Sequence, residues 1–242
     1  MGSTGLAGVD IRRSDGRFRT DAGWLRSRHS FSFGPHYDPS NTGFGLLVVS
    51  NDDVVAGGTG FSTHPHRDME IVTWVLEGEL VHQDSTGHNG LITPGLAQRM
   101  SAGSGLFHSE MNARDEAVRF VQMWVVPDTE QVVPSYEQRD ISDSLARGGL
   151  VPVASGGGHD AAIAIRQRDA VLYAARLGGG ASVSLPDAPY VHLYVAKGTV
   201  VLEGGGPLGS GDAARLVAAG GPDVTAAAEG AELLVWEMHA AR

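Results

Sequence analysis

Two pairs of potential metal ligands stand out in the chain: His64-Pro65-His66 and, further along, His108-Ser109-Glu110. Side chains alternate across a β-strand, so residues i and i+2 point to the same side. Two such pairs on two strands of one sheet would therefore aim four ligands at a single point. Three imidazoles and a carboxylate suit a divalent first-row transition metal.

This number of ligands indicates chemistry rather than a structural site. Four protein ligands on an octahedral ion leave two positions open for substrate and oxygen, whereas structural sites are closed. We expect one divalent ion, with Fe2+ preferred and Cu, Ni, Mn, Co or Zn as alternatives, because a His/carboxylate site accepts several metals. Other histidines are isolated in the sequence and are expected to be solvated or hydrogen-bonded locally: His82, His88, His159 and His239.

Composition excludes several other classes of protein. The 242 residues include no cysteine, which excludes disulfides, iron–sulfur clusters and thiolate zinc sites. A formal net charge of −10 opposes direct binding to nucleic acid. No apolar run is long enough to span a membrane, and the first eight residues lack the features of a secretory signal. We therefore expect a soluble cytoplasmic protein without a nucleic-acid or membrane partner.

The pattern of glycines and apolar runs predicts an all-β fold. The 34 glycines recur between short β-branched runs, as in β-sandwiches and barrels, and segments with helical periodicity are nearly absent. Five strands are predicted around the ligand pairs, over residues 69–76, 80–84, 91–93, 107–111 and 119–126.

A second β-domain is predicted from a weak internal repeat. Residues 191–202 resemble residues 69–81, with Gly198 in the place of the turn glycine Gly78. The positions that would correspond to the ligands are Ser184, Pro186, Ala228 and Gly230, which form no ligand set. We therefore predict a metal-binding domain over residues 1–136 and a metal-free domain over residues 137–242, with residues 127–150 as the connection.

Longer strings around the ligands resemble a known family. They include Thr63-His64-Pro65-His66-Arg67-Asp68-Met69-Glu70, Leu76-Glu77-Gly78-Glu79 and Met100-Ser101-Ala102-Gly103-Ser104-Gly105-Leu106-Phe107-His108-Ser109-Glu110. These strings resemble the pirin family of the cupin superfamily, most strongly over residues 20–140. The resemblance implies a bicupin, with two β-sandwich or jelly-roll barrel domains in tandem. It also implies a metal held by His64, His66, His108 and Glu110.

The choice of carboxylate ligand has an alternative. General cupins use the Glu that follows His-x-His, which here is Glu70, and strand parity would let it face the metal. The spacing from Glu70 to Gly78 is one residue longer than in the usual cupin pattern. The pirin pattern uses Glu110, which we prefer.

The resemblance implies a quercetin 2,3-dioxygenase-like activity, in which a flavonol and O2 react at the metal. Glu110 is then the catalytic residue that takes the proton of the flavonol hydroxyl. Apolar side chains are candidates to line the pocket: Phe31, Phe33, Phe44, Phe61, Met69, Met100 and Phe107. The family also includes a metal-dependent transcriptional co-regulator, so a redox-sensing module with a protein partner is the alternative. A different small-molecule enzyme on the same fold is a third possibility.

Overall fold

The computed structural model describes residues 8–242, so the N-terminal segment examined for a secretory signal lies almost wholly outside the described residues. Nearly all regular structure is β. The exceptions are the short 3-10 helix η1 (Ser14–Gly16) and one α-helix, α1 (Ser142–Ala146). Within residues 8–242, no helix is long and apolar enough to cross a bilayer.

Two sheets form the N-terminal domain. The larger has the strand order β12 (Ser135–Asp140), β9 (Leu96–Ser101), β6 (Glu70–Glu77), β11 (Val118–Val125), β4 (Leu47–Val55), β3 (Leu25–His29) and β2 (Phe18–Asp21). The smaller has the order β5 (Gly60–His66), β10 (Leu106–Met111), β7 (Leu80–Asp84) and β8 (Asn89–Ile92). An apolar cluster that includes Val75, Leu80 and Phe120 fills one end of the space between them.

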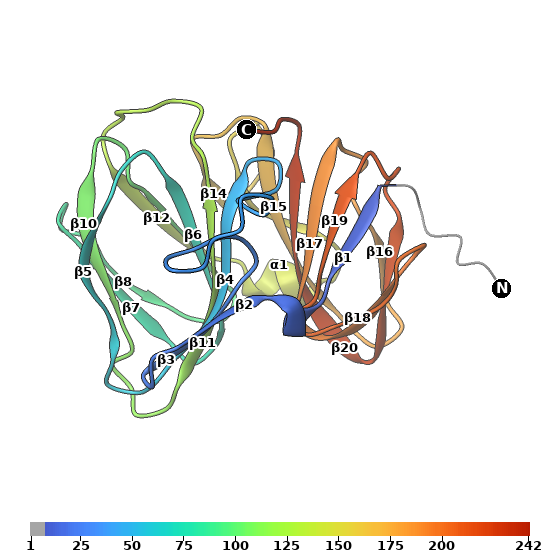
Figure 1. Ribbon diagram of the computed structural model, residues 1–242, viewed down its shortest axis with the longest axis horizontal. Coiled ribbons are helices and arrows are strands. Elements are labelled where there is room, and N and C mark those ends of the chain that lie inside the picture. Colours follow the sequence, from blue (N-terminus) through green and yellow to red (C-terminus); the bar gives the residue numbers. More distant parts are fainter. Residues whose placement is uncertain (1–7) are drawn as a thin grey trace.

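One large sheet forms the C-terminal domain, with the order β1 (Val9–Arg12), β19 (Ala213–Val217), β17 (Tyr190–Leu202), β20 (Asp223–Met238), β15 (Ala170–Leu177), β13 (Val151–Ser155) and β14 (Ile163–Ala164). In addition, β16 (Ser182–Ser184) pairs with β20, and β18 (Gly206–Gly209) pairs with β17. Figure 1 shows the two domains side by side. Strand β1 thus belongs to the C-terminal sheet, and the chain after it crosses to the N-terminal domain.

A shared core joins the domains. Strand β6 is buried on both faces, and its side chains at alternate positions have different surroundings. Trp74 belongs to the cluster that also contains Leu172 and Trp236 of the C-terminal domain, whereas Val75 belongs to the cluster within the N-terminal barrel. Because both faces of β6 are covered, its sequence is a nearly continuous apolar run and does not alternate between polar and apolar residues.

The predicted all-β bicupin is confirmed, and the five strands predicted around the ligand pairs correspond to β6, β7, β8, β10 and β11. The predicted turn at Gly198 is wrong. Strand β17 continues through this glycine, where the register with β20 shifts, and the chain turns only after Leu202. The domain boundary at residue 136 stays a prediction; β12, which spans it, pairs with β9.

Candidate metal centre

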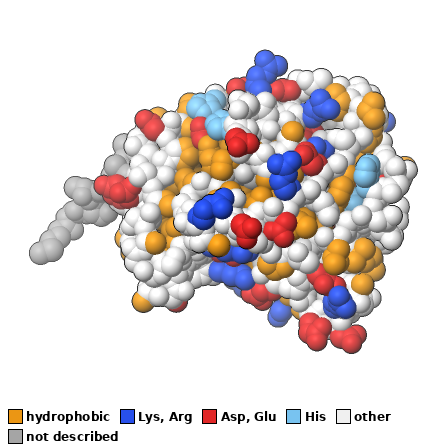
Figure 2. All heavy atoms as spheres, turned by 180° about the vertical axis from the view of Figure 1, so that it is seen from behind, with side chains coloured by type: hydrophobic (Ala, Val, Ile, Leu, Met, Phe, Trp, Pro, Cys, Tyr) orange, Lys and Arg blue, Asp and Glu red, His pale blue; other side chains and the backbone are white. Residues whose placement is uncertain are grey.

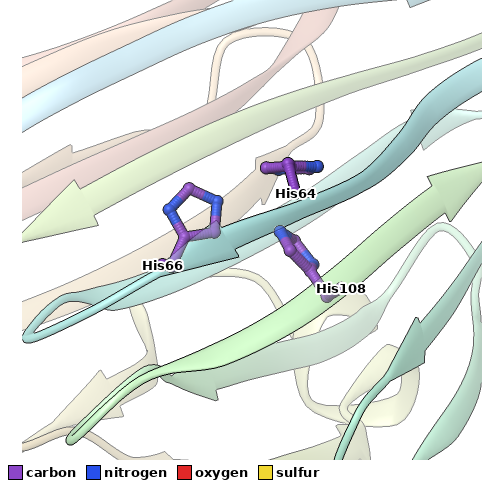
Figure 3. Close-up of side chains that lie close together, drawn as sticks. All are labelled: His64, His66 and His108. Atoms are coloured by element: carbon purple, nitrogen blue, oxygen red, sulfur yellow. The ribbon is translucent and has the colours of Figure 1, made fainter.

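Two neighbouring strands bring three histidines together. In the antiparallel pair β5–β10, His108 lies directly opposite His64, and His66 lies two residues along β5 on the same face. The ring centroids are 4.5 Å apart for His64 and His108 and 4.9 Å apart for both other pairs. Figure 3 shows the three rings directed toward one another from the two strands. One ligand nitrogen from each ring lies within 4.8 Å of the others.

The state of each ring fits a metal ligand. His64 Nδ1 lies 2.8 Å from the carbonyl oxygen of Ser62, so this nitrogen donates its proton and Nε2 is left with a lone pair. The Nε2 atoms of His66 and His108 are buried and have no hydrogen-bond partner. Buried polar atoms are almost always satisfied. Neutral nitrogen donors that converge without partners are the donor set that suits a divalent transition metal.

Burial keeps the rings of His66 and His108 neutral. Burial, with His64 nearby, lowers the pKa of His66 to about 4. Burial, together with His64, His66 and His82, lowers the pKa of His108 to about 2. Metal ions bind the deprotonated imidazole, so both side chains are ready for coordination at neutral pH without losing a proton.

Glu110 lines a cavity together with His64 and His66, but it lies outside the group of converging ligand atoms. Its carboxylate accepts hydrogen bonds of 3.0 and 2.7 Å from Gln122 Nε2, and a longer one of 3.4 Å from Thr73 Oγ1. Trp124 Nε1 donates to Gln122 Oε1 over 3.0 Å, which turns the amide nitrogen toward Glu110. Burial raises the pKa of Glu110. Its role as fourth ligand stays a prediction.

Glu70 has different surroundings. It is buried, and Ser101 Oγ donates to its carboxylate over 2.8 Å. Burial raises the pKa of Glu70, while the charge of Arg99 and a backbone hydrogen bond from Arg166 oppose this shift. Glu70 does not line the cavity that His64 and His66 share with Glu110. The geometry therefore favours Glu110 over Glu70 as a group that acts at this centre.

His64 and His66 form part of the wall of a cavity of about 360 Å³, and the buried His108 lies behind them. Aromatic side chains make up much of the remaining wall: Trp24, Phe33, Phe61 and Trp124. Of the apolar residues expected to line a pocket, Phe33 and Phe61 do so. The expectation is wrong for the others. Phe31, Phe44, Met69 and Met100 lie in or against apolar clusters, and Phe107 is 54% exposed beside an outer groove.

The floor of the cavity is polar, which the sequence analysis missed. It includes Ser27, His29, Asn51, Asp53 and Gln122. Asn51 on β4 pairs with Gln122 on β11 and with His29 on β3, so these side chains share one face of the sheet. The sequence contained a partial signal, because Asn51 and Asp53 interrupt one apolar strand at alternate positions and Gln122 interrupts another.

His82 is buried rather than solvated, but it is hydrogen-bonded locally to Asp84, which is one of the two expected outcomes. It is fully buried, and its Nε2 lies 3.2 Å from Asp84 Oδ2. Its Nδ1 lies 3.5 Å from Nδ1 of His108, which places His82 behind the candidate ligand. Strand pairing explains this, because β7 runs beside β10 and sets Asp84 opposite His108. The exposed His88 bonds locally to Thr86, as expected.

Comparisons with known proteins agree with this geometry. A family model described as Pirin matches residues 10–125, and a model described as the quercetinase C-terminal cupin domain matches residues 152–238. A Mycobacterium tuberculosis protein, whose name assigns it provisionally as a quercetin 2,3-dioxygenase, is 58% identical over 97% of this chain and 96% of its own. The quercetin 2,3-dioxygenase of Escherichia coli is 41% identical over 81% of this chain and 84% of its own. The crystal structure of the Escherichia coli pirin YhhW in complex with nickel(II) has a TM-score of 0.86 at 34% identity, covering 96% and 99% of the two chains.

Proposed function

The chain belongs to the pirin family, and from this premise we propose that it is a metal-dependent dioxygenase that cleaves flavonols such as quercetin with O2. The observation that carries the proposal is a cluster of three histidines, two of which, His64 and His66, lie in the wall of an accessible, aromatic-lined cavity. Its volume of about 360 Å³ lies within the range of small-molecule sites. Aromatic walls suit the flat rings of a flavonol.

A divalent transition metal held by His64, His66 and His108, with Glu110 as the proposed fourth ligand, would supply Lewis acidity and redox chemistry toward the substrate and O2. The nickel(II) complex of the Escherichia coli pirin supports the proposal that this chain binds a divalent metal. Fe2+ remains our preferred metal, with Cu, Ni, Mn, Co and Zn as alternatives.

Glu110 is the proposed general base. A flavonol carries a hydroxyl beside a carbonyl, and this hydroxyl must lose its proton before the ring can react with O2. A raised pKa makes the Glu110 carboxylate a better proton acceptor than an exposed one. Gln122 holds the carboxylate in place, and Trp124 fixes Gln122 in turn. After ring cleavage, family chemistry implies that carbon monoxide leaves.

Aromatic side chains then have two roles. Trp124 packs edge-on against His66, with ring centroids 4.8 Å apart, so it supports the candidate ligand as well as the cavity wall. Trp24 and Phe61 pack edge to face at 5.2 Å and cover the apolar side of the cavity. Excluding water around the substrate strengthens the electrostatic interactions within the site.

The regulatory alternative uses the same ligands, but a sensor site would be sealed from small molecules. His64 and His66 are only partly buried, and the cavity they line is open, which supports the enzyme. The experiment that separates the two functions is oxygen uptake with quercetin by fully metallated protein, with elemental analysis of the same samples. No oxygen consumption with any flavonol would favour the regulator.

We predict that Glu110→Gln lowers turnover by about 10²–10⁴-fold, the usual contribution of a positioned general base. Metal content should fall much less, because the three imidazoles remain. Glu79→Gln, at a partly buried residue outside the cavity, is the control and should behave as wild type. Loss of activity in Glu70→Gln with an active Glu110→Gln would show that the choice of carboxylate is wrong.

The histidine ligands have a separate test, in which His64→Ala/His108→Ala should lose most of the bound metal. Full metal retention in this variant, measured by elemental analysis, would refute the ligand set.

A further inference from the structure

A second cavity, of about 370 Å³, lies between the two domains. Its walls come from the chain between β1 and β2, from the loop after β3, and from β17 and β19 of the C-terminal domain. It shares His29 with the histidine cavity and no other lining residue. This interdomain cavity therefore lies beside the candidate catalytic site and is separate from it.

Unsatisfied polar atoms concentrate around the interdomain cavity. In the described residues, nine buried side-chain nitrogen or oxygen atoms lack a hydrogen-bond partner. Five belong to residues that line this cavity: Arg17 Nε, Ser30 Oγ, His192 Nδ1, His192 Nε2 and Arg215 Nε. Three others, on His66, His108 and Asp53, belong to the proposed catalytic centre. Buried polar groups are rarely left unpaired, so such a concentration points to a missing ligand.

The interdomain cavity is also positively charged. Arg17 and Arg215 are 8% and 6% exposed, and neither forms an ion pair with a carboxylate. Arg17 donates to the hydroxyl of Tyr194 and to backbone carbonyls. Arg215 donates to Ser30 O and Asn41 Oδ1, and its guanidinium lies 4.7 Å over the ring of Phe31.

Other charged groups compensate these arginines only in part. The charges of Asp52 and Arg17 interact, but Asp52 is already paired with Arg119 and does not line the interdomain cavity. Arg12 and Arg13 also line it, and they pair with Asp10 and Asp212 respectively. Asp38 is the carboxylate in the lining, and it accepts hydrogen bonds from Ser40. Burial and Arg12 lower the pKa of Arg215 to about 10, so it stays charged at neutral pH. Burying a cation without a counter-charge is costly.

We propose that the interdomain cavity binds a small oxyanion, a carboxylate or a phosphate, held by Arg17 and Arg215. Guanidinium N–H groups form their strongest hydrogen bonds with these anions. Neutral His192 and the Ser30 hydroxyl add further donors beside the two arginines. Water molecules could satisfy the same N–H groups, but they would leave most of the positive charge uncompensated.

Calorimetric titration of the full chain in chloride buffer tests the site, with inorganic phosphate in one arm and acetate in the other, at constant ionic strength. We expect saturable binding of at least one anion. The anion that binds more tightly identifies the ligand as a phosphate or a carboxylate. Arg215→Met keeps much of the apolar contact with Phe31 but removes the charge, so affinity should fall by about tenfold or more. Arg99→Met, a buried arginine outside this cavity, should bind as wild type. No saturable binding of either anion, or undiminished affinity in a folded Arg215→Met, would overturn the proposal.

A second measurement does not depend on any variant. Crystals grown without sulfate or phosphate and soaked in selenate should give an anomalous peak within hydrogen-bonding distance of Arg17 and Arg215. A soak that leaves this cavity without a peak, while selenate occupies other positions, refutes the site. Neither measurement uses flavonol turnover, so the outcome is independent of the proposed dioxygenase activity.

Discussion

At the scale of the residue, the cavity floor contains a carboxyl group under unusual constraint. Asp53 is 4% exposed, and burial, reinforced by the charges of Asp52 and Glu110, raises its pKa to about 7. Its Oδ1 has no hydrogen-bond partner. A carboxyl group whose pKa is raised by folding stabilises the protein at low pH and loses that contribution as pH rises from its unfolded pKa toward about 7.

We therefore predict that Asp53→Asn stabilises the protein more at pH 8 than at pH 5. The asparagine removes the buried charge. In the wild type, the free energy of unfolding falls by about 1.4 kcal/mol per pH unit between the unfolded and folded pKa values of Asp53. Thermal melts of wild type and variant at both pH values measure the difference. Asp140→Asn is a suitable control, because this residue is exposed. An equal effect of Asp53→Asn at pH 5 and pH 8 would contradict the raised pKa.

The clustering of the three candidate ligands could be predicted from the sequence, but the polar floor of the cavity could not. His64, His66 and His108 follow from strand parity alone, because two His-bearing strands had to pair. Asn51 and Gln122 required knowing that β4 and β11 are neighbours in the larger sheet, which is a long-range pairing. Gln122 also sits in a strand whose other face is buried against the C-terminal domain, so the expected alternation of polar and apolar residues is weak.

At the scale of the element, Gly198 shows why local pattern misled the prediction of the repeat. Its φ of +75° suits a turn, but here it accommodates an irregularity inside the long strand β17. A Cβ atom at this position would lie 2.0 Å from the carbonyl oxygen of Gly230 on β20. The glycine is therefore required by the close approach of a second strand, which the local sequence does not reveal.

Gly198→Ala should destabilise the protein by at least about 2 kcal/mol, since positive φ and the contact with Gly230 both oppose a side chain. Denaturant unfolding measures the loss. Gly178→Ala in the same domain is the matched control, because its Cβ would meet open space at a φ outside the positive region. A Gly198→Ala variant as stable as Gly178→Ala would show that the strands separate at no cost.

At the scale of the whole molecule, the charged residues determine the character of the surface, and the contacts between the domains determine how they are held together. Figure 2 shows basic and acidic side chains interspersed on the face opposite to that of Figure 1. The domains share an apolar core and specific polar contacts. Arg119 pairs with Asp52, and the Tyr194 hydroxyl donates to the same carboxylate over 2.5 Å.

We predict that the two domains unfold in one cooperative transition. Trp74 and Trp236 belong to one buried cluster, and Trp74 Nε1 donates to Glu232 Oε1 over 2.8 Å, so neither domain can unfold without exposing the core of the other. Trp74→Phe leaves that carboxylate oxygen without its donor and should cost about 1–3 kcal/mol. Scanning calorimetry should then show a single peak that shifts to lower temperature without splitting. Trp24→Phe, which removes an indole from the cavity wall rather than from the domain interface, should shift it less. Two separate transitions in the wild-type protein, with only one of them sensitive to Trp74→Phe, would mean that the interface is too weak to couple the domains.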